Sequence, residues 1–161
     1  MQFYNVTNDY INFLKKYDSK VLDNKKEHRP YVGIVLEIND IKYYAPLSSP
    51  KPKHKHMKNS KDFWKIHQGI YGAINFNNMI PVLDKALLLI DINSLTDEKY
   101  KRLLQNQYRY IRIDKEQIQK TAHNLHSLIF TEDNLLNSNE KRIKQRCCNL
   151  PVLESIITKY I

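Results

Sequence analysis

The sequence predicts an α+β fold in which a small, strongly curved antiparallel sheet packs against helices. Short apolar runs with β-type spacing recur through the first ninety residues, helical spacing begins near residue 96, and no Gly/Ser linker or internal repeat separates the two parts. A chain of 161 residues, 42% of them apolar, is long enough to bury one core. We therefore expect a single domain over residues 1–161.

The β part should begin with a short strand at residues 2–6. Its clearest element is a hairpin of residues 31–38 and 41–47, because apolar residues alternate in the first strand and Asn39-Asp40 is suited to a tight turn. Shorter β-like runs follow at residues 71–76, 79–83 and 87–92.

Helical spacing predicts four helices, which begin near residue 7 or 8 and cover about 96–112, 115–130 and 151–160. The first helix places Tyr10 either in the core or at a site. The second has an apolar stripe that includes Gln107. Its opposite face carries four cations, namely Lys101, Arg102, Arg109 and Arg112.

The net positive charge of the chain indicates what kind of molecule it binds. Lysine and arginine number 26 against 17 acids, a formal net charge of +9, which favours a polyanionic partner, either nucleic acid or an anionic membrane. An anionic membrane is the weaker candidate, because no apolar run approaches the length of about 20 residues needed to span a bilayer. The N-terminus does not resemble a signal peptide, so we expect a cytoplasmic protein, and the adjacent Cys147 and Cys148 should be reduced.

The strand over 41–47 leads directly into Ser48, Ser49 and Lys51, and a lysine- and histidine-rich segment follows. Arg29 precedes the partner strand of the same hairpin, so antiparallel pairing should bring it beside the two serines. Further candidate RNA-binding residues in the segment are Lys53, His54, Lys55, Lys58 and Trp64.

These residue types suit RNA cleavage, which needs cations for the phosphorane charge and groups that pass protons. Each also has an ordinary structural interpretation: the serines as a turn, the cations as solvated surface, and Trp64 as a core aromatic. The histidines lie among lysines, whose charge opposes a divalent cation, and no paired acids or phosphate-binding glycine motif occurs nearby. We expect neither a metal nor a cofactor.

The chain resembles the ToxN/AbiQ family of type III toxin–antitoxin endoribonuclease toxins over nearly its whole length. The resemblance lies in residues 3–4 with Tyr10-Ile11 and Leu14, in 33–38, and in Lys42-Tyr43 with residues 45–51. It continues at Ile74-Asn75, 79–81, 100–102, Gln107 and Ile111-Arg112.

The resemblance implies a curved β-barrel core like that of the MazF and Kid toxins, with extra helices. It also implies metal-independent RNA cleavage to 2′,3′-cyclic phosphate and 5′-hydroxyl ends. The expected inhibitor is a small structured RNA, cut by the toxin from a repeat precursor and bound in a closed toxin–RNA assembly that acts in phage defence by abortive infection.

Carried over to this sequence, the resemblance makes Ser49 and Lys51 the central pair, with Ser48, Arg29 and Tyr10 beside them. Arg29 stands where the family often has lysine, and because arginine keeps its charge it suits charge stabilisation better than general-base chemistry. The leading hypothesis is a sequence-preferring endoribonuclease toxin. A non-catalytic RNA-binding protein and a protein that binds an acidic protein partner are the alternatives. The sequence does not define the cleavage motif, the antitoxin fold, the stoichiometry, or which residue is acid and which is base.

Overall fold

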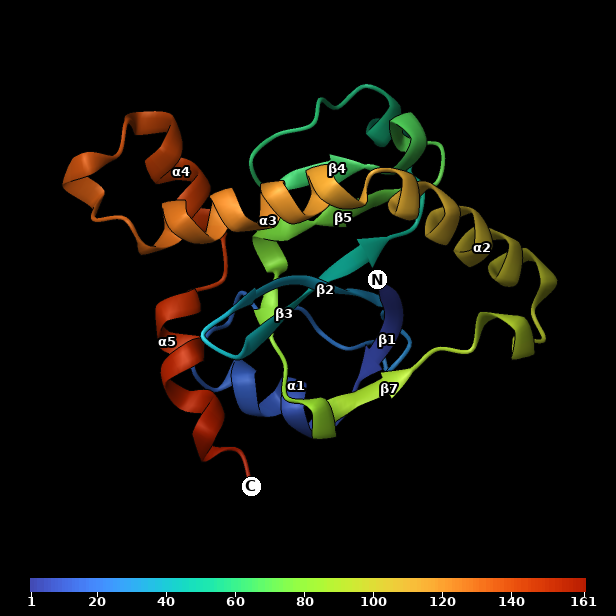
Figure 1. Ribbon diagram of the computed structural model, residues 1–161, viewed down its shortest axis with the longest axis horizontal. Coiled ribbons are helices and arrows are strands. Elements are labelled where there is room, and N and C mark those ends of the chain that lie inside the picture. Colours follow the sequence, from blue (N-terminus) through green and yellow to red (C-terminus); the bar gives the residue numbers. More distant parts are fainter.

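A seven-stranded antiparallel sheet organises the chain in the computed structural model, which describes residues 1–161 (Figure 1). The strands are β1 (Gln2–Val6), β2 (Tyr31–Ile38), β3 (Ile41–Ser48), β4 (Phe63–Lys65), β5 (Ala73–Asn75), β6 (Ile80–Pro81) and β7 (Leu87–Leu89). Their order is β4-β5-β3-β2-β1-β7, and β6 also pairs with β3. The mixed α+β prediction is therefore confirmed.

The sheet does not close into a barrel, so this part of the prediction is wrong. β4 and β7 form the two edges of the strand order and do not pair with each other. The physical reason is strand length. β4 to β7 have only two or three residues each, too few to extend the pairing around a closed cylinder.

The hairpin of β2 and β3 forms as predicted. Its register pairs Tyr31 with Pro46 and Ile38 with Ile41, and the turn residues Asn39 and Asp40 have φ values of 50° and 62°. Positive φ at both central positions is what a type I′ hairpin turn requires. A register shift between Gly33 and Leu36 bends the ribbon. β3 also pairs with β5 and β6, so its C-terminal end lies inside the sheet.

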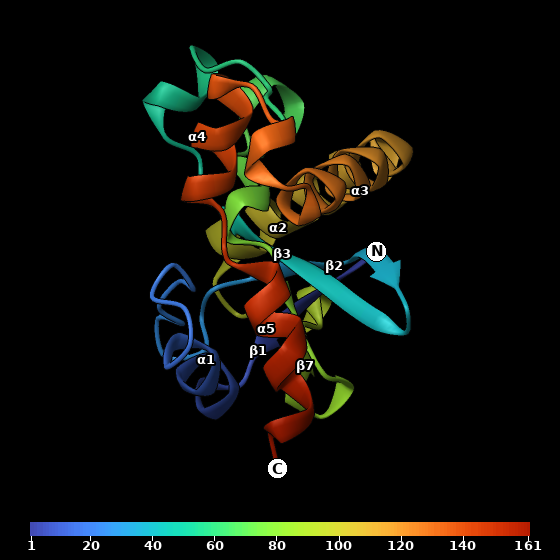
Figure 2. The ribbon, with the colours of Figure 1, turned by 90° about the vertical axis from the view of Figure 1, so that its left-hand side faces the viewer.

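Five α-helices surround the sheet: α1 (Asn8–Lys15), α2 (Glu98–Ile113), α3 (Lys115–Phe130), α4 (Ser138–Arg146) and α5 (Leu150–Ile156). α3 packs on β2, and α5 packs on α3 and β6. The segment after β3, β4 and α4 lie at one end of the molecule, and α1 and β7 lie at the other (Figures 1 and 2). None of the helices has the length and apolarity that crossing a membrane would take.

α4 and β4 were not predicted. At the start of α4, Asn137 and Glu140 form a reciprocal capping box in which each backbone N–H bonds the other side chain. β4 contributes three residues within the lysine- and histidine-rich segment that follows β3. Both elements help to enclose the region beyond β3.

Candidate active site

The end of β3 meets the loop before β2, as the hairpin predicted. The Leu47 N–H donates to the Pro30 carbonyl at 2.9 Å, which holds Arg29 beside Ser48. On the other side β5 pairs Ala73 with Ser48. Gly72 lies there at φ +93°, and a Cβ at this position would collide with the Ser48 carbonyl oxygen. This close approach fixes the strand end between its neighbours.

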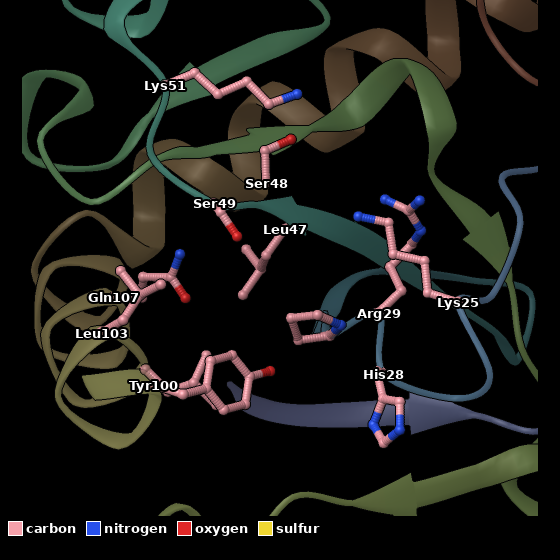
Figure 3. Close-up of a pocket in the computed structure, with 12 residues that line it drawn as sticks. Lys25, His28, Arg29, Leu47, Ser48, Ser49, Lys51, Tyr100, Leu103 and Gln107 are labelled. Atoms are coloured by element: carbon pink, nitrogen blue, oxygen red, sulfur yellow. The ribbon is translucent and has the colours of Figure 1, made fainter. Parts of the chain in front are cut away.

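Two hollows open on either side of Ser48, and Arg29, Ser48 and Lys51 line both of them. The first, here the α2 pocket, is bounded in addition by Lys25, His28, Pro30, Leu47, Ser49, Tyr100, Leu103, Leu104 and Gln107 (Figure 3). The second, here the β5 groove, has Lys53, Asp62, Asn75, Asn77, Asn78 and Arg146 among its lining residues. Two cations and a hydroxyl thus stand where the two hollows join.

Ser48 and Ser49 point their hydroxyls to opposite sides, as successive residues of an extended strand do (Figure 3). The Ser49 hydroxyl points into the α2 pocket, and the Ser48 hydroxyl points toward the side where the Lys51 amino group lies. The Asn75 Nδ2 donates to Ser48 Oγ at 2.5 Å. Because its oxygen already accepts this bond, the Ser48 hydroxyl keeps its own proton available for a ligand.

Lys51 is held through its backbone. Its N–H donates to Nδ1 of His54 at 3.3 Å, and the His54 N–H donates to the Lys51 carbonyl at 2.9 Å. Burial, followed by the charges of Lys51 and Lys53, lowers the pKa of His54, which keeps the ring neutral and Nδ1 able to accept. The Lys51 side chain is exposed and forms no ion pair, so its ammonium group can meet an anion.

Arg29 is half-buried, and its Nε donates to the Asp23 carbonyl at 2.8 Å. This bond fixes the guanidinium while its terminal amino groups have no protein partner. A fixed guanidinium beside an ammonium group suits a phosphate, since it offers planar donors without changing its charge.

The structure does not bring Tyr10 to the site. It is fully buried, its hydroxyl donates to the Pro81 carbonyl at 2.8 Å, and its ring packs edge-on against Tyr160. Burial raises the pKa of Tyr10, so the hydroxyl remains a donor. Of the two positions that the sequence allowed for Tyr10, core or site, the structure shows the core.

Two of the predicted RNA contacts are less accessible than the lysines around them. His54 is 2% exposed, so it contributes to the wall of the β5 groove mainly by supporting Lys51. Trp64 is half-buried against the core through β4, and its indole N–H is buried without a partner. Lys53, Lys55 and Lys58 are exposed, as an RNA-binding surface requires.

The basic face of α2 is remote from the α2 pocket. At about 100° per residue, Arg102, Arg109 and Arg112 lie on the side of the helix opposite Gln107. All three arginines are exposed, whereas Gln107 is 1% exposed. Lys101 shares their face and bonds the Asn93 carbonyl. The predicted cationic face exists, and it points away from the α2 pocket.

Sequence reasoning gave no chemical role to Asn75 or Gln107. Gln107 was placed in the apolar stripe of its helix, and an amide at a buried position is itself a signal, because buried polar groups take specific partners. Asn75 carried no such signal, since its contact with Ser48 depends on the pairing of β3 with β5. No three His, Cys, Asp or Glu side chains gather as a candidate metal site.

The fold and site define an α+β protein that gathers cations and hydroxyls, the groups that bind phosphate, at the end of a central strand. The family described as "Toxin ToxN, type III toxin-antitoxin system" matches residues 2–158. The chain belongs to this ToxN family of toxins.

Similarity to individual proteins extends along most of the chain. It is 34% identical over 139 residues to the endoribonuclease ToxN of Pectobacterium atrosepticum, covering 80% of this chain and 81% of that protein. A solved structure concerning a processed non-coding RNA that regulates a bacterial antiviral system matches with a TM-score of 0.83 at 30% identity, over 99% of each chain. Another, concerning selective toxin inhibition by a non-coding RNA pseudoknot, has a TM-score of 0.85 at 28% identity, over 99% of this chain and 96% of that one.

Proposed function

We propose that this chain is the toxin of a type III toxin–antitoxin system and a metal-independent, sequence-preferring endoribonuclease. One observation carries the proposal: Arg29, Ser48 and Lys51 line both hollows. A phosphodiester at this junction would have one nucleotide in the α2 pocket and the next in the β5 groove. The Pectobacterium relative carries the name endoribonuclease, which supports this assignment.

In the proposed reaction the 2′-oxygen of the RNA bonds to phosphorus and the bond to the 5′-oxygen breaks. The 2′-hydroxyl loses a proton and the 5′-oxygen gains one, which yields 2′,3′-cyclic phosphate and 5′-hydroxyl ends. Lys51 and Arg29 stabilise the charge of the phosphorane. Ser48 donates to a phosphate oxygen, and Ser49 positions the nucleotide on the other side of the strand.

The proposed partner is a small structured antitoxin RNA that the toxin cuts from its own repeat precursor and that inhibits it in a closed toxin–RNA assembly in the cytoplasm. The similarity to structures concerned with an RNA pseudoknot and with an antiviral system supports this part and a role in phage defence by abortive infection. The cationic face of α2, remote from the α2 pocket, gives a wrapped RNA a second surface to contact.

Expression in a bacterial host tests the proposal. The chain alone should arrest growth and give cellular RNA new 5′-hydroxyl ends, and co-expression of the repeat-bearing DNA upstream of its gene should relieve the arrest. Expression of the Lys51→Met variant should leave growth unaffected, while Lys120→Met, which changes an exposed lysine of α3, should remain toxic. The rival, a non-catalytic RNA-binding protein, would bind RNA through α2 and leave it intact.

A further inference from the structure

The α2 pocket has a polar atom that the cleavage chemistry does not use. Gln107 is 1% exposed, and its Nε2 donates to the Tyr71 carbonyl at 2.8 Å. Its Oε1 is buried and has no partner. Figure 3 shows this oxygen pointing into the pocket, on the side toward which the Ser49 hydroxyl also points.

The bond to Tyr71 fixes which end of the amide faces the pocket. A rotation of the amide by 180° would place Oε1 against the Tyr71 carbonyl, bringing two acceptors together and leaving the amino group unpaired. Gln107 therefore presents an acceptor to the pocket, and a buried acceptor without a donor is costly. The missing donor is most simply supplied by a ligand.

The other walls of the pocket suit a flat, partly apolar group. Leu47, Leu103 and Leu104 are apolar, and Tyr100 contributes a half-buried ring of the kind on which unstacked bases pack. Lys51 and Arg29 also line the pocket, and the scissile phosphate of the proposed reaction binds beside them. A nucleobase attached to that phosphate would extend toward Gln107.

We propose that the α2 pocket binds the nucleobase next to the scissile phosphate, and that Gln107 Oε1 selects a base with an amine at purine C6 or pyrimidine C4, which means adenine or cytosine. Adenine N6 and cytosine N4 are donors, whereas guanine and uracil carry an acceptor oxygen at the corresponding position. Guanine or uracil in the same pose would place two acceptors face to face. This inference rests on the proposed endoribonuclease function.

The test compares cleavage of RNAs that differ at one base. Wild-type protein is first used to map the cut site by sequencing 5′-hydroxyl ends, and each base is then varied on both sides of the cut. At one of the two positions adenine or cytosine should give a kcat/KM about ten- to a hundredfold above guanine or uracil, the range that one base contact supports. Where adenine is preferred, replacing it with purine riboside, which lacks the amine, should lower kcat/KM by a similar factor. Where cytosine is preferred, replacing it with 2-pyrimidinone riboside should have the same effect.

Three variants separate selection from folding. Gln107→Met should abolish the preference at that position and make it insensitive to loss of the amine. Gln107→Glu, which keeps an oxygen acceptor and can donate to Tyr71 when protonated, should retain part of the preference. Gln105→Met, on the exposed side of the same helix, should behave like wild type.

The outcomes distinguish the two proposals. Wild-type protein that leaves no 5′-hydroxyl ends would overturn the endoribonuclease function and this inference with it. Wild-type protein that cuts RNA but tolerates loss of the amine at both positions would overturn the inference alone. The inference alone would also be overturned if a Gln107→Met variant, shown to be folded by a thermal melt, cut RNA with unchanged base preference.

Discussion

Asn75 donates through its side-chain amide to the Ser48 hydroxyl at 2.5 Å, and this bond joins the last residue of β5 to the last residue of β3. It orients the only side-chain hydroxyl that lies on both hollows at once, beside Arg29 and Lys51. In the proposed function the two cations bind the phosphate at this point, and the bond from Asn75 leaves the Ser48 proton free to be donated to it.

Replacing Asn75 with alanine should lower kcat for RNA cleavage by about tenfold, the effect of losing one positioned hydrogen bond of roughly 1.4 kcal/mol. KM should change little, because Arg29 and Lys51 remain. Single-turnover cleavage by Asn75→Ala and by the control Asn139→Ala, on the exposed surface of α4, provides the measurement. Equal rates for the two variants would show that Ser48 does not depend on Asn75.

Gly72→Ala should damage both stability and activity. Its φ of +93° is unfavourable for any residue with a Cβ, and the new methyl group would collide with the Ser48 carbonyl oxygen. We expect a loss of about 2 kcal/mol or more, and hence a fall in Tm of roughly 4–8 °C for a chain of this size. Calorimetry together with a cleavage assay at a temperature where the variant is folded checks this. A variant that melts and cuts like wild type would contradict the close approach of β5 to β3.

Cleavage and stability should both decline on the acid side because of His54. Burial and the neighbouring lysines lower its pKa in the folded protein, so the unfolded chain takes up the proton first as pH falls below the ordinary value of 6.5. The stability contributed by neutral His54 is complete above pH 6.5 and is lost as pH falls toward the lowered pKa. Protonation also removes the acceptor for the Lys51 backbone N–H.

His54→Asn keeps a side-chain acceptor and cannot titrate, so it should retain activity at neutral pH and lose the acid limb of the rate profile. His126, which is also buried with a lowered pKa, supplies a control that titrates away from the site. His126→Asn should alter thermal stability and leave the pH dependence of cleavage unchanged. An acid limb that persists in His54→Asn would assign it to another group.

The cationic face of α2 should matter for antitoxin binding rather than for cleavage of short substrates. Arg102→Ala, Arg109→Ala and Arg112→Ala remove exposed charges opposite Gln107, so cleavage of a short RNA should stay within about twofold of wild type. Affinity for the structured RNA should fall, and the slope of log K against log salt should decrease by about 0.7 for each single-strand phosphate that the variant no longer neutralises. A salt titration of binding measures both quantities. Unchanged slopes would exclude this face from the RNA complex.

The elements that the sequence predicted are those whose signal is local. The alternation over residues 31–38 and the turn at Asn39-Asp40 define the hairpin, and that hairpin alone brings Arg29 beside Ser48. β4 was missed because its three residues lie among lysines, and α4 because its charges obscured the capping box. Asn75 and Gln107 gain their roles only when β5 meets β3 and α2 covers the pocket. Tyr10 shows the converse error, since a polar group with a plausible chemistry was assigned to a site from which burial excludes it.

The proposed cleavage at the junction of the two hollows is tested most directly by the ends of the RNA it produces. Purified protein is incubated with RNA in excess EDTA, and the products are labelled by a polynucleotide kinase without prior phosphatase treatment. Wild-type products should accept the label at 5′-hydroxyl ends and carry 2′,3′-cyclic phosphates, while Lys51→Met and Ser49→Ala should cut at least about a hundredfold more slowly and still bind the antitoxin RNA. Products with 5′-phosphates, or a Lys51→Met variant that cuts at the wild-type rate, would contradict the account.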